Sequence, residues 1–270
     1  LEDFPASRIT VGEALKRYDA TGESERAVKV LEAALAENPP TKREFRINLA
    51  QRLRLMGRSD ESQALLAAAI EEAQDPPLQA LHWADLGSHY FETGEHDLAV
   101  DAAGKAYKLR PQPVEPDIAF DYAEALLLVG RFDEAIEISK QIDVPAYKEF
   151  IVARSHLMQG RPAQAIEHFD AGLTHWPDSA VARYYTALAA ESLGDFDRAI
   201  AEYRYSMRIE PRGTDSRFRL ANILEGQGDY LQAARAVGHG DRTDTADTPS
   251  QLHRVRLLAK AGELNGLGQL

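Results

Sequence analysis

Eight glycines recur along this chain of 270 residues at a spacing close to 34 residues. They are Gly22, Gly57, Gly94, Gly130, Gly160, Gly194, Gly228 and Gly262. A fixed period in this range is typical of stacked supersecondary units, each of which buries its apolar face only against its neighbours. We therefore expect a repeat architecture, and a function in binding rather than in catalysis.

Other residue types keep phase with the glycines. Small residues recur five places after the first seven glycines and seven places before most of them, which predicts a close crossing of two helices in every unit. The glycine is expected to end the first helix. Proline, which cannot continue a helix, is expected to end the second one at Pro39, Pro111, Pro177 and Pro211. Aromatic residues on the second helices are expected to fill the space beside the crossings (Phe132, Phe169, Phe196, Tyr203 and Tyr230).

This combination resembles the tetratricopeptide repeat family, whose unit is a helix-turn-helix of 34 residues. The strongest match is residues 80–113, through Trp83, Leu86, Gly87, Tyr90, Gly94, Ala99, Ala106 and Pro111, and residues 180–213 match less fully. The resemblance implies an all-α, right-handed α-solenoid of about seven and a half repeats that forms a single domain over residues 1–270. Its units are expected to start near residues 8, 43, 80, 116, 146, 180 and 214, with a partial last unit from 248.

Three departures from the regular period carry their own expectations. The fourth unit is four residues short, which predicts a second helix shortened by about one turn, an end near Val144, and a change of superhelical pitch. The seventh unit breaks at Gly238 into a polar segment that we expect to be a solvated loop; its His239, Asp241, Asp244 and Asp247 lack the spacing of a metal site. The last unit lacks a second helix, so Leu252, Val255 and Leu258 are expected to be uncovered and to support homo-oligomerisation or a continuation of the chain.

Composition excludes several classes of function. The net charge of −12 argues against binding to nucleic acid or to anionic membranes. The absence of cysteine excludes disulfides and thiolate metal sites, and leaves both a cytoplasmic and a periplasmic location open. No apolar run approaches the ~18 residues of a membrane helix, so we expect a soluble protein without membrane insertion. No hydrolase, phosphate-loop, zinc-protease or dinucleotide motif is present, so we expect neither an enzyme nor a cofactor.

The remaining candidate site is the inner surface of the coil. The resemblance implies that the first helices line a concave groove and that the fifth residue of each unit points into it. In units four to seven these residues are all aromatic, and residues one helical turn later add polar groups. The predicted partner-binding residues are Phe120, Glu124, Phe150, Arg154, Tyr184, Phe218 and Asn222. The aromatic residues also fit a second interpretation, in which they only pack neighbouring repeats together.

The function predicted from these features is a non-catalytic scaffold that binds a protein or peptide partner in the concave groove. A partner with an acidic C-terminal tail would need basic and amide residues in adjacent units, but here those residues lie in different units. Acidic residues prevail in the middle and late groove, so a basic and apolar partner is favoured. One alternative is a recruiting or regulatory segment of a larger enzyme, or of a secretion or polysaccharide-export assembly. Another is carbohydrate binding through the aromatic residues.

Overall fold

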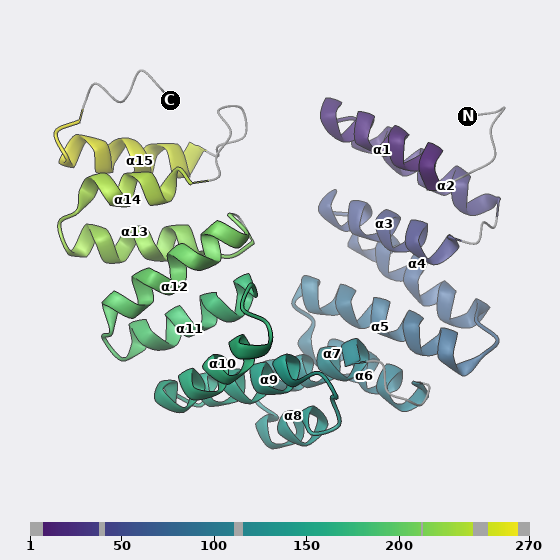
Figure 1. Cartoon of the computed structure of the whole chain (residues 1–270). Coiled ribbons are helices and arrows are strands. Elements are labelled where there is room, and N and C mark those ends of the chain that lie inside the picture. The colour runs from purple at the N-terminus through teal and green to yellow at the C-terminus, as the bar shows by residue number, and fades with distance from the viewer. Residues whose placement is uncertain (1–7, 38–40, 111–115, 212, 240–247, 264–270) are drawn as a thin grey trace. The chain divides into compact units, whose positions relative to one another are not determined.

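The computed structural model describes residues 8–37, 41–110, 116–211, 213–239 and 248–263. These residues form fifteen helices, and no strand occurs among them (Figure 1). Successive helices pack as antiparallel neighbours throughout each part of the chain. The expected all-α repeat solenoid is therefore confirmed.

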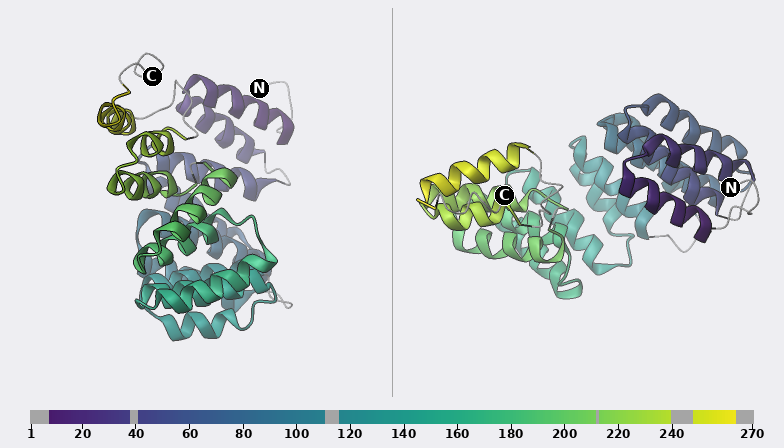
Figure 2. Two further views of the ribbon diagram at one scale, coloured as in Figure 1. Left: turned by 60° about the vertical axis from the view of Figure 1, so that its left-hand side comes forward. Right: turned by 90° about the horizontal axis from the view of Figure 1, so that it is seen from above.

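The chain divides into two compact units, Leu1–Arg131 and Phe132–Leu270. The first contains α1 (Arg8–Thr21), α2 (Ser24–Ala36), α3 (Lys42–Leu55), α4 (Ser59–Glu72), α5 (Pro76–Thr93), α6 (His96–Leu109) and α7 (Pro116–Leu128). The second contains α8 (Phe132–Ser139), α9 (Pro145–Met158), α10 (Pro162–His175), α11 (Ala180–Ser192), α12 (Phe196–Ile209), α13 (Ser216–Gly226), α14 (Tyr230–Val237) and α15 (Thr248–Lys260). Within each unit the helices stack in chain order (Figure 2). That residues 1–270 form one continuous solenoid stays a prediction.

Each of the eight recurring glycines follows the end of a first helix and adopts the left-handed conformation, with φ between 70° and 81°. The amide of the next residue donates to the carbonyl five positions earlier, for example from Glu95 to Tyr90 at 2.8 Å and from Asp195 to Ala190 at 3.0 Å. This is the Schellman arrangement, which satisfies carbonyls left open at a helix end. A Cβ at any of these eight glycines would meet no atom within 4 Å, so glycine is needed there for its backbone conformation and not for space.

Close packing explains the small residues that keep phase with the glycines. The residues five places after the first seven glycines are all buried, with exposures of 1% or less (Ala27, Ser62, Ala99, Ala135, Ala165, Ala199 and Ala233). A Cβ added at Gly87 would lie 3.3 Å from the backbone nitrogen of Ala103, which shows how closely α5 and α6 approach. The predicted crossing points are therefore confirmed.

The second helices end where proline was expected to stop them, since α10 ends at His175 before Pro177 and α12 ends at Ile209 before Pro211. The fourth repeat differs from its predicted length. Its second helix, α8, has 8 residues where α10 and α12 have 14, and it ends at Ser139 rather than near Val144. The second helix is therefore shortened by more than one turn, because the chain must still reach Pro145, which begins α9. One first helix also begins early: α5 starts at Pro76, since the Asp75 side chain accepts a hydrogen bond from the Leu78 amide and caps it.

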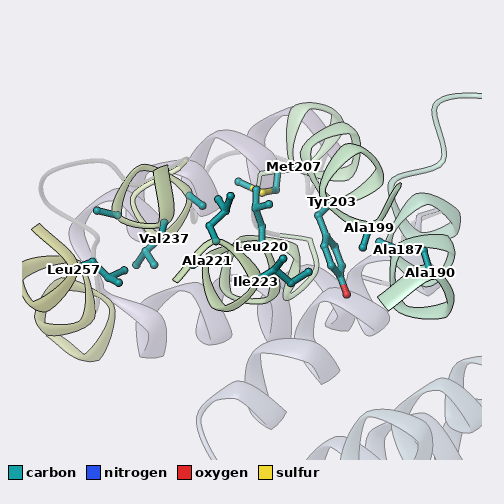
Figure 3. Close-up of a cluster of buried hydrophobic side chains, with 14 of the residues drawn as sticks. Ala187, Ala190, Ala199, Tyr203, Met207, Leu220, Ala221, Ile223, Val237 and Leu257 are labelled. Atoms are coloured by element: carbon teal, nitrogen blue, oxygen red, sulfur yellow. The ribbon is translucent and has the colours of Figure 1, made fainter. Parts of the chain in front are cut away.

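The core of the second unit is centred on Tyr203, which is fully buried (Figure 3). Its ring stands between Ala187 and Ala190 of α11 on one side and Leu220 and Ile223 of α13 on the other. Two predicted aromatic fillers, Tyr203 and Phe169, are thus confirmed as core residues.

The prediction for a third filler, Phe196, is wrong. It is the first residue of α12 and is 45% exposed. Phe132 and Tyr230, at the same position of their repeats, are half-buried.

The first helices of adjacent repeats also touch one another, α5 with α7 and α9 with α11. No comparable contact joins second helices of adjacent repeats in the described part of the chain. The larger contacts between repeats join the second helix of one repeat to the first helix of the next, for example α10 to α11, and the first helices add a smaller contact with one another.

Candidate functional site

The predicted site residues are divided between the two units. Phe120 and Glu124 lie on α7 in the first unit. The second unit holds Phe150 and Arg154 on α9, Tyr184 on α11, and Phe218 and Asn222 on α13. Each group is described within its own unit.

The two α9 residues form part of a packed aromatic cluster. Phe150 and Arg154 are each 9% exposed. The Phe150 ring meets Phe169 and Tyr185 edge to face, at 5.8 Å in both cases, and the Arg154 guanidinium lies 4.4 Å from the centre of the Tyr185 ring. Tyr185 therefore holds both residues in place, through aromatic and cation–π contacts. Sequence reasoning missed Tyr185 because it follows Tyr184 directly, and only one of the two was assigned to the inner face.

Tyr184 and Phe218 are half-buried and pack on the same apolar cluster as Tyr203. Tyr184 meets Tyr185 at 5.2 Å and Tyr203 at 6.1 Å between ring centres. The guanidinium of Arg217 lies 4.4 Å from the Phe218 ring centre, and Asn222, one turn further along α13, is exposed. Together these residues give α11 and α13 a surface of two partly accessible rings beside the exposed side-chain amide of Asn222.

A polar network fixes this surface from beneath. The Tyr203 hydroxyl donates to Glu191 Oε2 at 2.6 Å, and Arg219 Nη1 lies 3.7 Å from Glu191 Oε1. Burial, followed by the hydrogen bond to Glu191, raises the pKa of Tyr203 above its ordinary value, so the hydroxyl remains protonated and continues to donate. Desolvation lowers the pKa of Arg219, but the nearby Tyr203, Glu191 and Tyr184 outweigh it and raise that pKa above its ordinary value. The network therefore links α11, α12 and α13 at the point where Tyr184 emerges.

Charges at the end of the second unit are compensated. Glu225 on α13 faces three basic residues of α15: Lys260 Nζ at 2.7 Å, Arg256 Nη2 at 3.3 Å and His253 Nε2 at 3.5 Å. The hydrogen bond from Lys260 contributes most to lowering the pKa of Glu225 below its ordinary value. The acidic character expected for the late groove is therefore offset here.

The first unit instead contains a hollow between α5, α6 and α7. This cavity has a volume of about 240 Å³, and Phe91, Glu92, Ile118, Asp121 and Glu124 are among its lining residues. A second cavity of about 190 Å³ between α3, α4 and α5 adjoins it and shares Ser88 and Glu92.

The acidic residues around these cavities differ in their partners. Arg54 pairs with Glu92 at 2.7 Å, and Arg43 donates two hydrogen bonds to Asp85 at 2.6 and 2.9 Å. No hydrogen bond or ion pair reaches Asp121 from the residues that the structure describes. Desolvation, followed by the charges of Glu124, Asp117 and Asp85, raises the pKa of Asp121 to about 6.

A serine and a histidine meet in the second cavity, but their geometry is that of a structural contact. The Ser62 hydroxyl donates to the Ala50 carbonyl at 2.8 Å, and His89 Nδ1 lies 3.2 Å from the Ser62 Oγ atom. The serine proton is thus directed away from the imidazole, whereas a base that activates a nucleophile must accept that proton. Ser62 occupies the position five places after a recurring glycine, which is alanine in the other repeats. His89 supplies a partner for the buried Ser62 oxygen.

Among the described residues, no three His, Asp or Glu side chains lie close enough together to hold a metal ion. Of the four residues named in the polar segment after Gly238, Asp241, Asp244 and Asp247 lie outside the described residues. In the described part of the chain, no helix has both the length and the apolar content that crossing a membrane requires.

Three models of the tetratricopeptide repeat match the chain, over residues 10–102, 116–138 and 153–213. The chain is a tetratricopeptide repeat protein. The family supports a general role as a protein-interaction scaffold.

Curated relatives of this tetratricopeptide repeat protein match it only in part. A stretch of 76 residues is 32% identical to the "Probable biofilm formation methyltransferase WspC" of Pseudomonas putida, and covers 28% of this chain and 18% of that protein. Another stretch, of 126 residues, is 21% identical to the "Tetratricopeptide repeat and J domain-containing co-chaperone DNJ1" of Fusarium oxysporum, and covers 47% of this chain and 24% of that protein. The tetratricopeptide repeat protein thus spans less than a quarter of the length of either relative.

Solved structures resemble the tetratricopeptide repeat protein over more of its length. A tetratricopeptide repeat protein from Parabacteroides merdae is 16% identical, with a TM-score of 0.61, and the match covers 94% of this chain and 98% of that one. The thermophilic protein TTC0263 from Thermus thermophilus is 18% identical, with a TM-score of 0.54, over 67% of this chain and 99% of that one. At these identities the likeness concerns the fold alone.

Proposed function

We propose that this tetratricopeptide repeat protein is a non-catalytic scaffold that binds a peptide or protein partner on the first-helix face of its repeats. In the second unit the binding residues are Tyr184, Phe218 and Asn222. The observation that carries the proposal is the pair of half-buried rings on α11 and α13, which lie on one apolar cluster next to an exposed amide. Large rings held by a packed base provide contact area at little cost in conformational entropy, and an amide adds direction.

Phe150 and Arg154 have a supporting role in this proposal. Both are already engaged with Tyr185, so they shape the floor of the surface and present little of their own area to a ligand. Phe120 and Glu124 belong to the first unit, where the proposal extends to the face of α7. The net charge of −12 disfavours nucleic acid as the partner.

The test begins with chemical crosslinking of the full-length protein in its native cell, followed by binding measurements with the purified partner. Tyr184→Ala and Phe218→Ala should each weaken binding by about tenfold or more, as expected for aromatic anchors. Phe196→Ala is the matched control, because Phe196 is an exposed ring on a second helix. A partner that binds both variants as tightly as the wild type would contradict the proposed surface.

A second candidate function is a recruiting or regulatory segment of a larger enzyme or export assembly. It is favoured by the match to part of a protein named a methyltransferase, of which the matched stretch is less than a fifth. The boundaries of the full-length gene distinguish the two functions. A reading frame that continues into a catalytic domain supports the segment, and a frame confined to the repeats supports the independent scaffold.

Self-association through the last helix is a separate part of the proposal. Leu252 on α15 is 64% exposed and Val255 is half-buried. The expectation that Leu258 is uncovered was wrong, since it is 7% exposed and packs into the cluster around Tyr203. Of these three residues, Leu252 and part of Val255 are therefore accessible for contact with a second copy. Light scattering of Leu252→Asp beside the wild type tests whether they join two copies.

A further inference from the structure

The cavity between α5, α6 and α7 has the size of a side-chain slot. Its volume of about 240 Å³ lies below the roughly 300–1,000 Å³ of sites for small molecules and cofactors. It is nevertheless several times the ~30 Å³ that one water molecule occupies in the liquid. The hollow is therefore suited to one long side chain.

The cavity exists because its floor is made of small residues. Ala84 and Gly87 of α5 face Ala99, Ala103 and Ala106 of α6, and the two helices approach closely there. Phe91 and Ile118 add larger apolar surfaces to the lining. In the second unit the corresponding space beside α9 and α10 is filled by the rings of Phe150, Phe169 and Tyr185.

The polar part of the lining is acidic. Glu92 from α5 is paired with Arg54, whereas the α6 lining residues are all alanine and contribute no charge. From α7 come Asp121 and Glu124, and Asp121 has no ion pair within the described residues. The charges of Asp117 and Asp85 act on Asp121 as well, and Arg43 is paired with Asp85. Asp121 is exposed, so its carboxylate lies at the mouth of the slot. An apolar slot with an uncompensated carboxylate at its mouth complements a cation on an aliphatic stem.

We propose that this cavity receives a lysine or arginine side chain of the partner peptide, with its methylene groups against Phe91 and Ile118 and its charged end beside Asp121. The inference rests on the proposed function and names the partner's chemistry at the first unit. A divalent metal ion fits the lining less well, because such ions require several oxygen ligands and most of this lining is apolar. A free polyamine shares the chemistry of lysine and is distinguished by the test.

The test uses the full chain to select binders from a library of random linear peptides, and measures the selected peptides by calorimetry. The selected peptides should share a lysine or arginine next to apolar residues. Replacing that residue by norleucine should weaken binding to the wild type by about tenfold and leave binding to Asp121→Asn nearly unchanged, which is the coupling expected of two residues in contact. Glu71→Gln, on the exposed face of α4, is the control: it removes one negative charge, as Asp121→Asn does, and should bind as the wild type does.

Two further measurements separate occupancy of the slot from general attraction between charges. Ser88 is exposed and lines the cavity, so Ser88→Leu should fill the entrance, block the peptide and leave the fold intact. Lowering the pH from about 7.5 to 5 should weaken binding to the wild type more than to Asp121→Asn, since protonation of Asp121 removes the attraction.

The outcomes distinguish this inference from the proposed function. Peptides that lose affinity with Tyr184→Ala, but show no coupling to Asp121 and no effect of Ser88→Leu, support the scaffold and overturn the slot. A library that yields no binder to the wild type contradicts both. Putrescine that binds the wild type as tightly as the peptides, and displaces them, overturns a peptide side chain as the occupant.

Discussion

The same helical framework encloses a hollow in the first unit and a filled aromatic core in the second. Around α5 and α6 the crossing is lined by alanine and glycine, which leaves a cavity of about 240 Å³ beside Asp121. Around α9 and α10 the rings of Phe150, Phe169 and Tyr185 pack with their centres within 6.2 Å of one another. The glycine turns and small crossing residues thus set the frame, and the residues between them decide whether a repeat is hollow or full.

This difference has a consequence for binding. A filled repeat can present a ring only at its surface, as Tyr184 does, and it then offers contact area with little depth. A hollow repeat can admit a side chain and surround it, which confers specificity through shape and charge. The two units are therefore expected to recognise different features of a partner.

The largest expected effect comes from emptying the full repeat. Phe169→Ala should lower the free energy of unfolding by about 3–5 kcal/mol, because the residue is 1% exposed and its removal leaves a cavity among packed rings. Urea denaturation followed by circular dichroism measures this loss. Filling the hollow with Ser88→Leu should change stability by less than about 1 kcal/mol. Equal costs for the two substitutions would show that the repeats do not differ in packing.

The glycine turns should be equally sensitive in both units. Gly94→Ala and Gly194→Ala should each cost about 1–2 kcal/mol, since alanine at φ of 81° or 76° is strained although space is available. Gly12→Ala is the matched control: it lies inside α1 without a positive φ, and alanine there should stabilise by about 0.5–1 kcal/mol. A loss of stability from Gly12→Ala would remove backbone conformation as the explanation.

The frame could be predicted from the sequence because it rests on local rules. Each recurring glycine is required for one backbone conformation, and each buried alanine for one close contact between helices. Both requirements are the same in every repeat, so both residue types recur at a regular spacing in the sequence. The end of α8 at Ser139 was not predicted, since only the length of the gap could be seen and not the path that the chain takes from Ser139 to Pro145. Phe196 was misplaced because an aromatic residue at the start of a helix can face either the core or the solvent.

The candidate site was less predictable because it depends on contacts between repeats. The burial of Phe150 and Arg154 follows from Tyr185, which comes from the next repeat along the chain. The cavity beside Asp121 results from the absence of large residues on three helices, which no single motif marks. Whether the predicted residues contact a partner stays a prediction.

An intermediate effect is expected from the hydroxyl that anchors the Tyr184 surface. Tyr203→Phe should lower the free energy of unfolding by about 1–2 kcal/mol, because it removes a hydrogen bond to the charged Glu191 in a buried core. Tyr205→Phe is the control, since the Tyr205 hydroxyl donates to Asp178 at the exposed edge, and its loss should cost less than about 0.5 kcal/mol. Chemical denaturation of both variants makes the comparison, and equal losses would contradict a special role for the buried network.

The smallest expected effect is the dependence of stability on the charge of Asp121. Its pKa of about 6 lies above the ordinary value of 3.8, so the folded protein binds this proton more tightly than the unfolded chain does. The wild type should therefore become less stable relative to Asp121→Asn as the pH rises through 6, and the two should converge as the pH falls toward 4. Unfolding midpoints of both proteins between pH 4 and 8 give the difference directly. A difference that stays constant would show that folding does not shift this pKa, and a difference that grows in acid would show that a partner stabilises the carboxylate. Either result would contradict the uncompensated charge that separates the hollow repeat from the full one.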